Sequence, residues 1–166
     1  MEQSHKMKTT SAVIAIILVL AVAYVLFANY RSDQGGLSLF GDKNGTSKAV
    51  VEHTPAVNGV LPEPAGLPTG LPLETENITE SVTTSYPDQG ATQLSVSYLS
   101  SKTVAQKYQE YKDYMTQAGY ELSEGDSSAP VRALFGTNVD ADLSVVISSQ
   151  GAETLVQLAY LLKSTN

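Results

Sequence analysis

Apolar and polar residues alternate along several short segments in the second half of the chain. Residues 93–99 carry an apolar side chain at every second position, and residues 143–147 repeat the pattern. A period of two with one apolar face is typical of a half-buried β-strand. The turn-forming residues 87–90 predict a hairpin that joins residues 93–99 to the strand before them. The further strands that we expect cover residues 78–86, 120–124 and 131–136.

A helical period replaces this alternation between residues 103 and 118. The apolar residues that share one face of this helix are Val104, Tyr108, Tyr111 and Met115. Thr103 and Gln106 have the spacing of a capping box, and Gly119 stands where a helix end needs a left-handed residue. The charged residues that we assign to the solvated face are Lys107, Glu110, Lys112 and Asp113.

The last element, residues 153–163, fits two structures. Leu155, Leu158 and Leu162 suit one face of a helix, whereas alternate residues from Val156 to Leu162 suit a strand. We favour the strand, because the gap that separates it from residues 142–148 has the length of a hairpin loop. The chain is therefore predicted to form an α+β domain over residues 72–166, an antiparallel sheet of about four to six strands with one packed helix.

The longest apolar run lies near the N-terminus, where no charged side chain occurs from Thr9 to Tyr30. About 20 apolar residues in a helix cross the ~30 Å hydrocarbon core of a bilayer. We predict a single transmembrane helix over residues 11–30, preceded by a tail of residues 1–10. A cleavable signal peptide with a small-x-small site at residues 21–23 is the alternative. We favour a retained signal-anchor, because the apolar run continues beyond that site.

The charges around this run predict its orientation. Lys6, Lys8 and the amino terminus precede the run, whereas Arg31 and Asp33 cancel after it. The positive-inside rule then makes the tail of residues 1–10 cytoplasmic and the C-terminal domain periplasmic or extracellular. We therefore expect a single-pass protein of the plasma or inner membrane that contacts the lipid bilayer through residues 11–30.

Glycine and proline are concentrated between the apolar run and the predicted domain. Residues 31–71 contain seven glycines and four prolines, which disfavour regular structure. This segment is expected to be a linker. Two apolar islands, residues 37–40 and residues 50–51, interrupt it, and they are expected to dock on a partner, on the membrane or on the domain.

The negative charge of the protein is confined to the predicted domain. The formal charge of the chain is −7, and residues 72–166, which hold twelve acidic and five basic side chains, carry all of it. Nucleic acids and anionic lipids attract clusters of Lys and Arg, so we expect no nucleic-acid partner.

Few residues of the chain are suited to a catalytic site. The chain has no cysteine, which excludes disulfides, thiolate nucleophiles and cysteine-ligated zinc. Both histidines, His5 and His53, precede the predicted domain, so a Ser-His-Asp arrangement within it is excluded. We expect a protein that is not an enzyme and that uses no cofactor.

Two groups of residues are candidates for binding. Asn138, Asp140 and Asp142 begin like a calcium loop, but Leu143 and Ser149 stand where that loop requires Gly and Glu. We favour a strand-connecting turn over a weak calcium site. The aromatic residues that could line a ligand pocket, or else belong to the core and its rim, are Tyr98, Tyr108, Tyr111, Tyr114 and Tyr160.

The order of several short motifs resembles a known group of proteins. Leu71-Pro72-Leu73 precedes the hairpin, Ser100 to Val104 opens the helix, Tyr108 lies within it and Gly119-Tyr120 ends it. This order is similar to that of uncharacterised bacterial membrane-anchored domains, in which an LP-LP lead-in precedes a strand pair, a helix of the type S-x-x-x-V-x-x-F-Y ending in G-W, and a closing hairpin. Tyr120 replaces the usual Trp here. The resemblance covers residues 67–162 and implies one helix on an antiparallel sheet, with no catalytic residue.

Three functions fit these observations. The first is a membrane-tethered binding or scaffolding module that meets a protein partner in the cell envelope. The second is a sensor or carrier domain for a small ligand or cation. The third is a subunit of a pilus or secretion complex, which the sequence favours least, because the apolar run has no early glutamate and no processing site before it.

Overall fold

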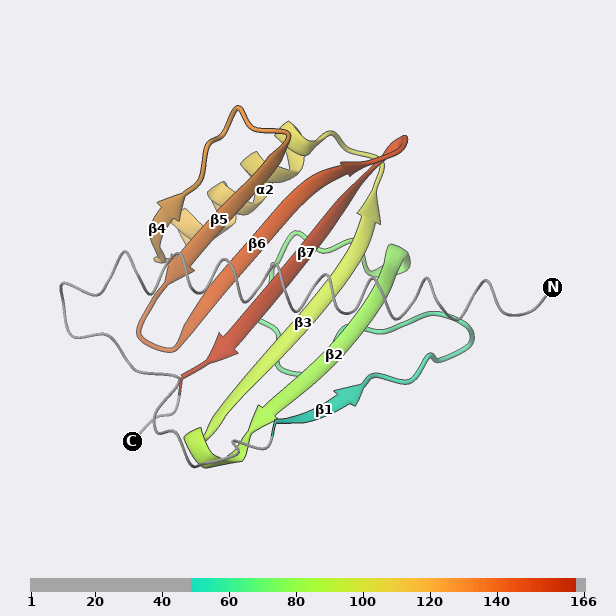
Figure 1. Ribbon diagram of the computed structural model, residues 1–166, viewed down its shortest axis with the longest axis vertical. Helices are drawn as coiled ribbons and strands as arrows, with labels where there is room; N and C mark the ends of the chain where they lie inside the picture. The colour runs from blue at the N-terminus through green and yellow to red at the C-terminus, as the bar shows by residue number, and fades with distance from the viewer. Residues whose placement is uncertain (1–48, 164–166) are drawn as a thin grey trace. The chain divides into compact units, whose positions relative to one another are not determined.

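The computed structural model describes residues 49–163. Seven strands form one sheet in the order β1-β2-β3-β7-β6-β5-β4, and every neighbouring pair is antiparallel (Figure 1). The strands are β1 (Val50–His53), β2 (Ile78–Tyr86), β3 (Ala91–Ser100), β4 (Glu121–Glu124), β5 (Val131–Thr137), β6 (Ala141–Gln150) and β7 (Glu153–Leu162). Helix α2 spans Val104–Gln117, and short 3-10 turns span Thr75–Asn77 and Pro87–Gln89.

The predicted α+β class is confirmed, but the sheet is larger than the expected four to six strands. The additional strand is β1, which lies inside the segment 31–71 that we expected to be a linker. Val50–His53 pairs with Val82–Ser85 of β2. Two valines at residues 50–51 were too short a run to predict a strand, because a strand of this length is fixed by its partner rather than by its own pattern.

The final element is a strand, and it occupies the middle of the sheet. β7 pairs with β6, as the hairpin-length gap predicts, and also with β3 on its other side. One row of core side chains therefore runs across three strands, from Leu94 through Tyr160 to Leu143. All three residues are buried, together with the next row along the strands. The core thus lies on a single face of the sheet.

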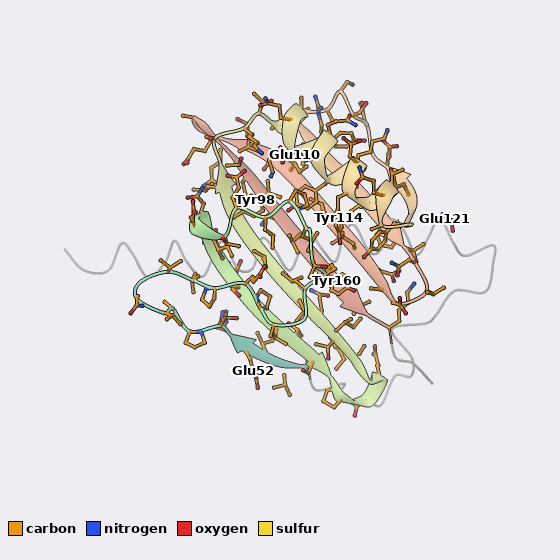
Figure 2. All side chains as sticks on the ribbon, turned by 180° about the vertical axis from the view of Figure 1, so that it is seen from behind. Glu52, Tyr98, Glu110, Tyr114, Glu121 and Tyr160 are labelled. Atoms are coloured by element: carbon orange, nitrogen blue, oxygen red, sulfur yellow. The ribbon has the colours of Figure 1, made fainter. Side chains whose placement is uncertain are left out.

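Helix α2 covers one half of this face, over β4, β5 and β6 (Figure 2). Thr103 and Gln106 form the predicted capping box, and Gly119 adopts a φ of 75° directly after the helix. Tyr111 and Met115 are fully buried on the inner side of the helix. The predicted apolar face of the helix is therefore confirmed.

A crossing segment, residues 54–77, covers the other half of the same face. Four of its leucines pack partly buried against the core, namely Leu61, Leu67, Leu71 and Leu73. The backbone at Gly66 approaches Leu94 of β3, and the backbone at Gly70 approaches Tyr114 of α2. The compact unit accordingly begins at Ser47, well before the expected boundary at residue 72.

The predictions for the N-terminal part fall outside the described residues. These are the tail of residues 1–10, the transmembrane helix of residues 11–30 and the linker up to residue 48. Between residues 49 and 163, no helix is long and apolar enough to cross a bilayer.

Removal of the crossing segment is expected to weaken the domain. A chain that begins at Ser47 should fold, whereas a chain that begins at Leu71 loses β1 and the packing of Leu61 and Leu67. We expect a loss of about 3 kcal/mol or more from the apolar surface that is exposed. Urea denaturation followed by circular dichroism measures the difference. Equal midpoints for the two chains would show that residues 47–70 are not part of the fold.

Truncation of a core residue of the helix is expected to lower the free energy of unfolding by a similar amount. Tyr111→Ala should destabilise the protein by about 3 kcal/mol or more, because it opens a cavity under the helix. Lys112→Ala is the control, since its exposed ion pair with Glu124 contributes about 1 kcal/mol at most. Urea midpoints that are similar for the two variants would contradict the assignment of Tyr111 to the core.

Candidate functional site

Lys107 is buried, with 1% of its surface exposed. Its assignment to the solvated face of the helix was wrong. The helical period does place it next to Tyr111, and the crossing segment passes over this position. Glu110 and Lys112 are partly exposed, and Asp113 is exposed, as expected. We call the residues around this side chain the Lys107 cluster: Pro72, Glu74, Tyr98, Lys107, Glu110 and Tyr111.

The Lys107 ammonium joins three parts of the chain. It donates to the carbonyl oxygen of Pro72 at 2.8 Å and to the Glu110 carboxylate at 2.8 Å, and it lies 3.4 Å from Glu74 Oε1. Its Nζ also lies 5.2 Å from the centre of the Tyr98 ring. The ammonium therefore has a partner for each of its three protons, and the crossing segment is held to the helix.

The tyrosine hydroxyls of the cluster extend this network. Tyr98 donates to the Pro72 carbonyl at 3.0 Å. A hydroxyl has one proton, so the 3.0 Å contact between the two tyrosine oxygens makes Tyr111 the donor to Tyr98. Ser100 donates to Glu74 at 2.6 Å, which attaches the end of β3 to the same network.

This geometry favours a structural role over a catalytic one. Burial lowers the pKa of Lys107, but the Glu110 carboxylate and the Tyr98 oxygen outweigh burial and raise the pKa above its ordinary value. Burial raises the pKa of Tyr111 well above its ordinary value. A nucleophilic amine or a tyrosinate base would need the opposite shifts. In the Lys107 cluster, the lysine is thus charged, the two tyrosines are neutral, and these three side chains are hydrogen-bonded within the domain.

The five candidate tyrosines do not converge on one pocket. Tyr98 and Tyr111 belong to the Lys107 cluster, whereas Tyr108 donates to Glu124 at 2.5 Å on the β4 side. Burial, and to a lesser extent the nearby Tyr160, raise the pKa of Tyr114, and neither residue belongs to the Lys107 cluster. Figure 2 shows Tyr98, Tyr114 and Tyr160 at separate points of the covered face.

Asn138, Asp140 and Asp142 lie in and beside the turn between β5 and β6. The Asn138 side chain accepts from the backbone N–H groups of Asp140 and Ala141 at 3.0 and 2.8 Å, as expected for a turn. Asp142 forms an ion pair with Lys163, and Lys163 also donates to the Asn138 carbonyl. A lysine ammonium thus occupies the place of the cation. Residues 49–163 contain no group of three or more acidic or histidine side chains that could hold a metal ion.

Within residues 49–163, the outer edge of β1 has no pairing strand and is called here the open edge. The backbone N–H of Thr54, directly after β1, donates to the Ser81 carbonyl at 2.9 Å. Hydrogen-bonded pairs alternate along an antiparallel ladder, so Glu52 also turns its backbone groups toward β2. The N–H and C=O groups of Val51 and His53 therefore point outward. In the described part of the chain, no strand pairs with this edge.

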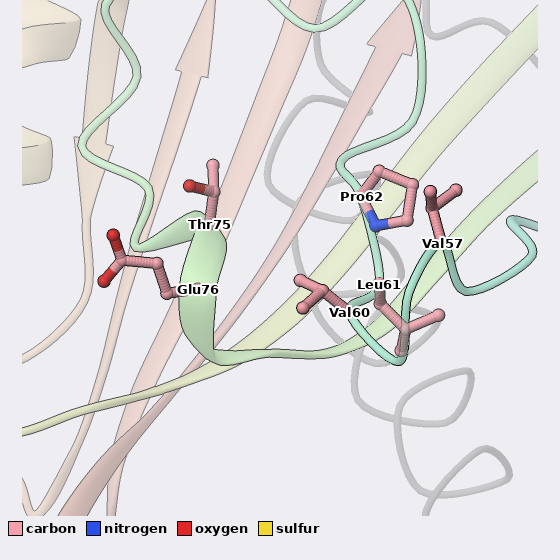
Figure 3. A pocket seen from close by; sticks show the side chains of 6 residues that line it. All are labelled: Val57, Val60, Leu61, Pro62, Thr75 and Glu76. Atoms are coloured by element: carbon pink, nitrogen blue, oxygen red, sulfur yellow. The ribbon is translucent and has the colours of Figure 1, made fainter.

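A small apolar hollow follows β1 along the chain. Val57 and Val60 exchange two backbone hydrogen bonds of 2.8 and 3.0 Å across the turn Asn58-Gly59, where both φ angles are positive. The side chains of Val57 and Val60 are 59% and 50% exposed. The hollow has a volume of about 280 Å³. The residues that line it are Val57, Val60, Leu61, Pro62, Thr75 and Glu76 (Figure 3).

Sequence reasoning missed this turn, although the signal is present. Asn-Gly between two β-branched residues is the strongest short-range sign of a tight hairpin. The surrounding glycines and prolines of residues 31–71 masked it, because the segment was interpreted by its average composition.

Comparisons of the chain with protein-family models, with curated proteins and with solved structures found no match. The resemblance of residues 67–162 to bacterial membrane-anchored domains stays a prediction.

Loss of the Lys107 charge is expected to destabilise the protein in a pH-dependent way. Lys107→Met leaves the carboxylates of Glu74 and Glu110 without their buried partner, which should cost about 3 kcal/mol at pH 7. The folded-state pKa of Lys107 is raised, so its contribution is complete below the ordinary value of 10.5 and is lost as the pH rises through the raised pKa. The difference in the free energy of unfolding between the wild-type protein and Lys107→Met should therefore become smaller at alkaline pH.

Urea denaturation at neutral and alkaline pH measures this difference in the free energy of unfolding. Lys102→Met is the matched control, because Lys102 contacts the same Glu110 but its side chain is 47% exposed. We expect it to cost about 1 kcal/mol at most. Equal losses in the two variants would contradict the structural role of the Lys107 cluster.

Proposed function

We propose that this protein is a membrane-tethered, non-enzymatic binding module that meets a protein partner outside the plasma or inner membrane. A single-pass signal-anchor over residues 11–30 would hold it, with the N-terminus in the cytoplasm. The observation that carries the proposal is the open edge of β1, beside which exposed valines stand. Strand addition to an exposed sheet edge is a common mode of peptide recognition.

The two edges of the sheet differ in how they are protected. β4 carries Glu121 and Glu124, and Glu124 is bonded to Lys112 and Tyr108 of the helix. Charged and covered edges resist pairing with other chains. β1 instead presents Val50 and Val51, whose side chains are both about half exposed. This contrast supports β1 as the edge that receives a partner.

The tyrosines lend no support to the alternative of a small-ligand sensor. The hydroxyls of Tyr98, Tyr108 and Tyr111 are all bonded to groups within the domain. The hollow beside β1, at about 280 Å³, lies at the lower end of ligand-pocket volumes of ~300–1,000 Å³. Its size suits a single side chain of a partner.

Site-specific crosslinking of the full chain in intact source cells tests the proposal. A photo-reactive residue at position 51 should give one defined adduct, because a strand that pairs with β1 lies against this position. The same residue at position 123, in β4 at the opposite edge, is the matched control and should give no such adduct. Mass spectrometry then identifies the crosslinked segment.

A second pair of variants separates binding from stability. Val57→Ser and Val60→Ser change exposed side chains, and each should alter stability by less than about 0.5 kcal/mol. Both should lower the yield of the adduct from position 51. Equal adducts from positions 51 and 123, or none from position 51, would refute β1 as the binding edge.

A further inference from the structure

Positive and negative charges are segregated along the described residues. From Ala49 to Ser101 the chain contains no Lys or Arg, whereas its acidic residues there are Glu52, Glu63, Glu74, Glu76, Glu80 and Asp88. The five bases all follow residue 101. Apart from His53, the charged residues that β1, β2, β3 and the crossing segment contribute are therefore all acidic.

The lysines of the other half are already engaged. Lys102, Lys107, Lys112 and Lys163 each pair with a carboxylate, and the Arg132 guanidinium lies over the Tyr108 ring. Among the described residues, no ion pair involves Glu52, Glu63 or Glu76. Within the described residues, no ion pair neutralises these three carboxylates, so they can attract an external cation.

The hollow combines two surfaces that suit one type of side chain. Its walls are Val57, Val60, Leu61 and Pro62, and Glu76 lines the opposite side, where its carboxylate is turned away from these four residues (Figure 3). Lys and Arg bury an apolar stem while their charged end stays near water or a carboxylate. A long basic side chain would lay its stem against the valines and extend its charged end toward the side of the hollow that Glu76 lines.

We infer that the partner contributes an extended, positively charged polypeptide segment, which pairs with the outer edge of β1 and places one Lys or Arg side chain in the hollow. This inference rests on the proposed function and specifies its partner. Figure 1 shows the chain running on past the end of β1 before it turns back across the sheet. Val57 follows His53 by only four residues, so we expect an added strand that continues beyond His53 to reach the turn of Val57 and Val60.

Charge also argues against a second copy of the domain at this edge. Two copies joined through β1 would bring their two anionic halves together, with Glu52 of one strand near Glu52 of the other. Like charges that face each other across strands are destabilising. A cationic segment of another protein has the complementary charge.

Synthetic peptides test the inference directly. The first probe is an extended peptide of about eight residues in which Lys alternates with Val or Thr, a length suited to a short strand. Two matched probes carry Ser or Glu in place of Lys, and a fourth has alternate backbone nitrogens methylated. Fluorescence anisotropy measures the binding of each to the full chain in nanodiscs of neutral lipid.

The Lys peptide should bind at least about tenfold more tightly than the Ser peptide, and the Glu peptide should not bind. Methylation should abolish binding, because it removes the donors that pair with β1. Glu76→Gln should remove most of the preference for Lys. Asp88→Asn is the matched control, since it removes the same charge from the same half, at the β2–β3 turn, and should keep the preference.

Several outcomes would overturn the inference while the proposed function stands. In the peptide assay, these are equal binding of the Lys and Ser peptides, or equal effects of Glu76→Gln and Asp88→Asn. In the crosslinking experiment, it is an adduct between position 51 and a second copy of the chain, or between position 51 and an uncharged segment of another protein. An adduct from position 51 to residues 1–48 of the same chain would overturn both proposals. Absence of any adduct would do the same.

Discussion

The bond between the Lys107 ammonium and the Pro72 carbonyl fixes the arrangement of the whole covered face. A single sheet with its core on one side needs a cover, and α2 spans only half of it. The crossing segment supplies the rest, yet its glycines and prolines give it little regular structure of its own. The Lys107 cluster replaces that missing structure with directed bonds, since Pro72 and Glu74 are held by the helix and by β3 at once.

The strands and the helix could be predicted from sequence because each has a local signal. Six strands show alternation or turn chemistry, and α2 shows a capping box and an apolar face. The burial of Lys107 has no local signal: a lysine at a helix position is normally solvated, and only a segment more than thirty residues earlier in the chain covers it. The same reason explains β1, which is a strand only because β2 lies beside it.

The candidate site was missed for a related reason. The predicted candidates were residues with chemistry, namely tyrosines and carboxylates, and most of these are engaged within the fold. The open edge of β1 is defined by backbone groups, which carry no sequence signature. Only the Asn58-Gly59 turn and the exposed valines around it could have drawn attention to this region, and both lie in a segment whose composition is that of a linker.

The described lysines pair with carboxylates away from β1, which explains why the β1 half is negatively charged. Burying Lys107 requires carboxylates at its side, and Glu110 serves both Lys107 and Lys102. The other lysines of residues 49–163 are paired around the helix and the β5–β6 turn, so none of them forms an ion pair with β1. Among the described strands, β1 is an edge strand that pairs with β2 alone, and all four of its residues are exposed, so little packing holds it. A cationic strand at this edge would supply the missing backbone partners and the missing countercharge together, so binding and local order at β1 are coupled.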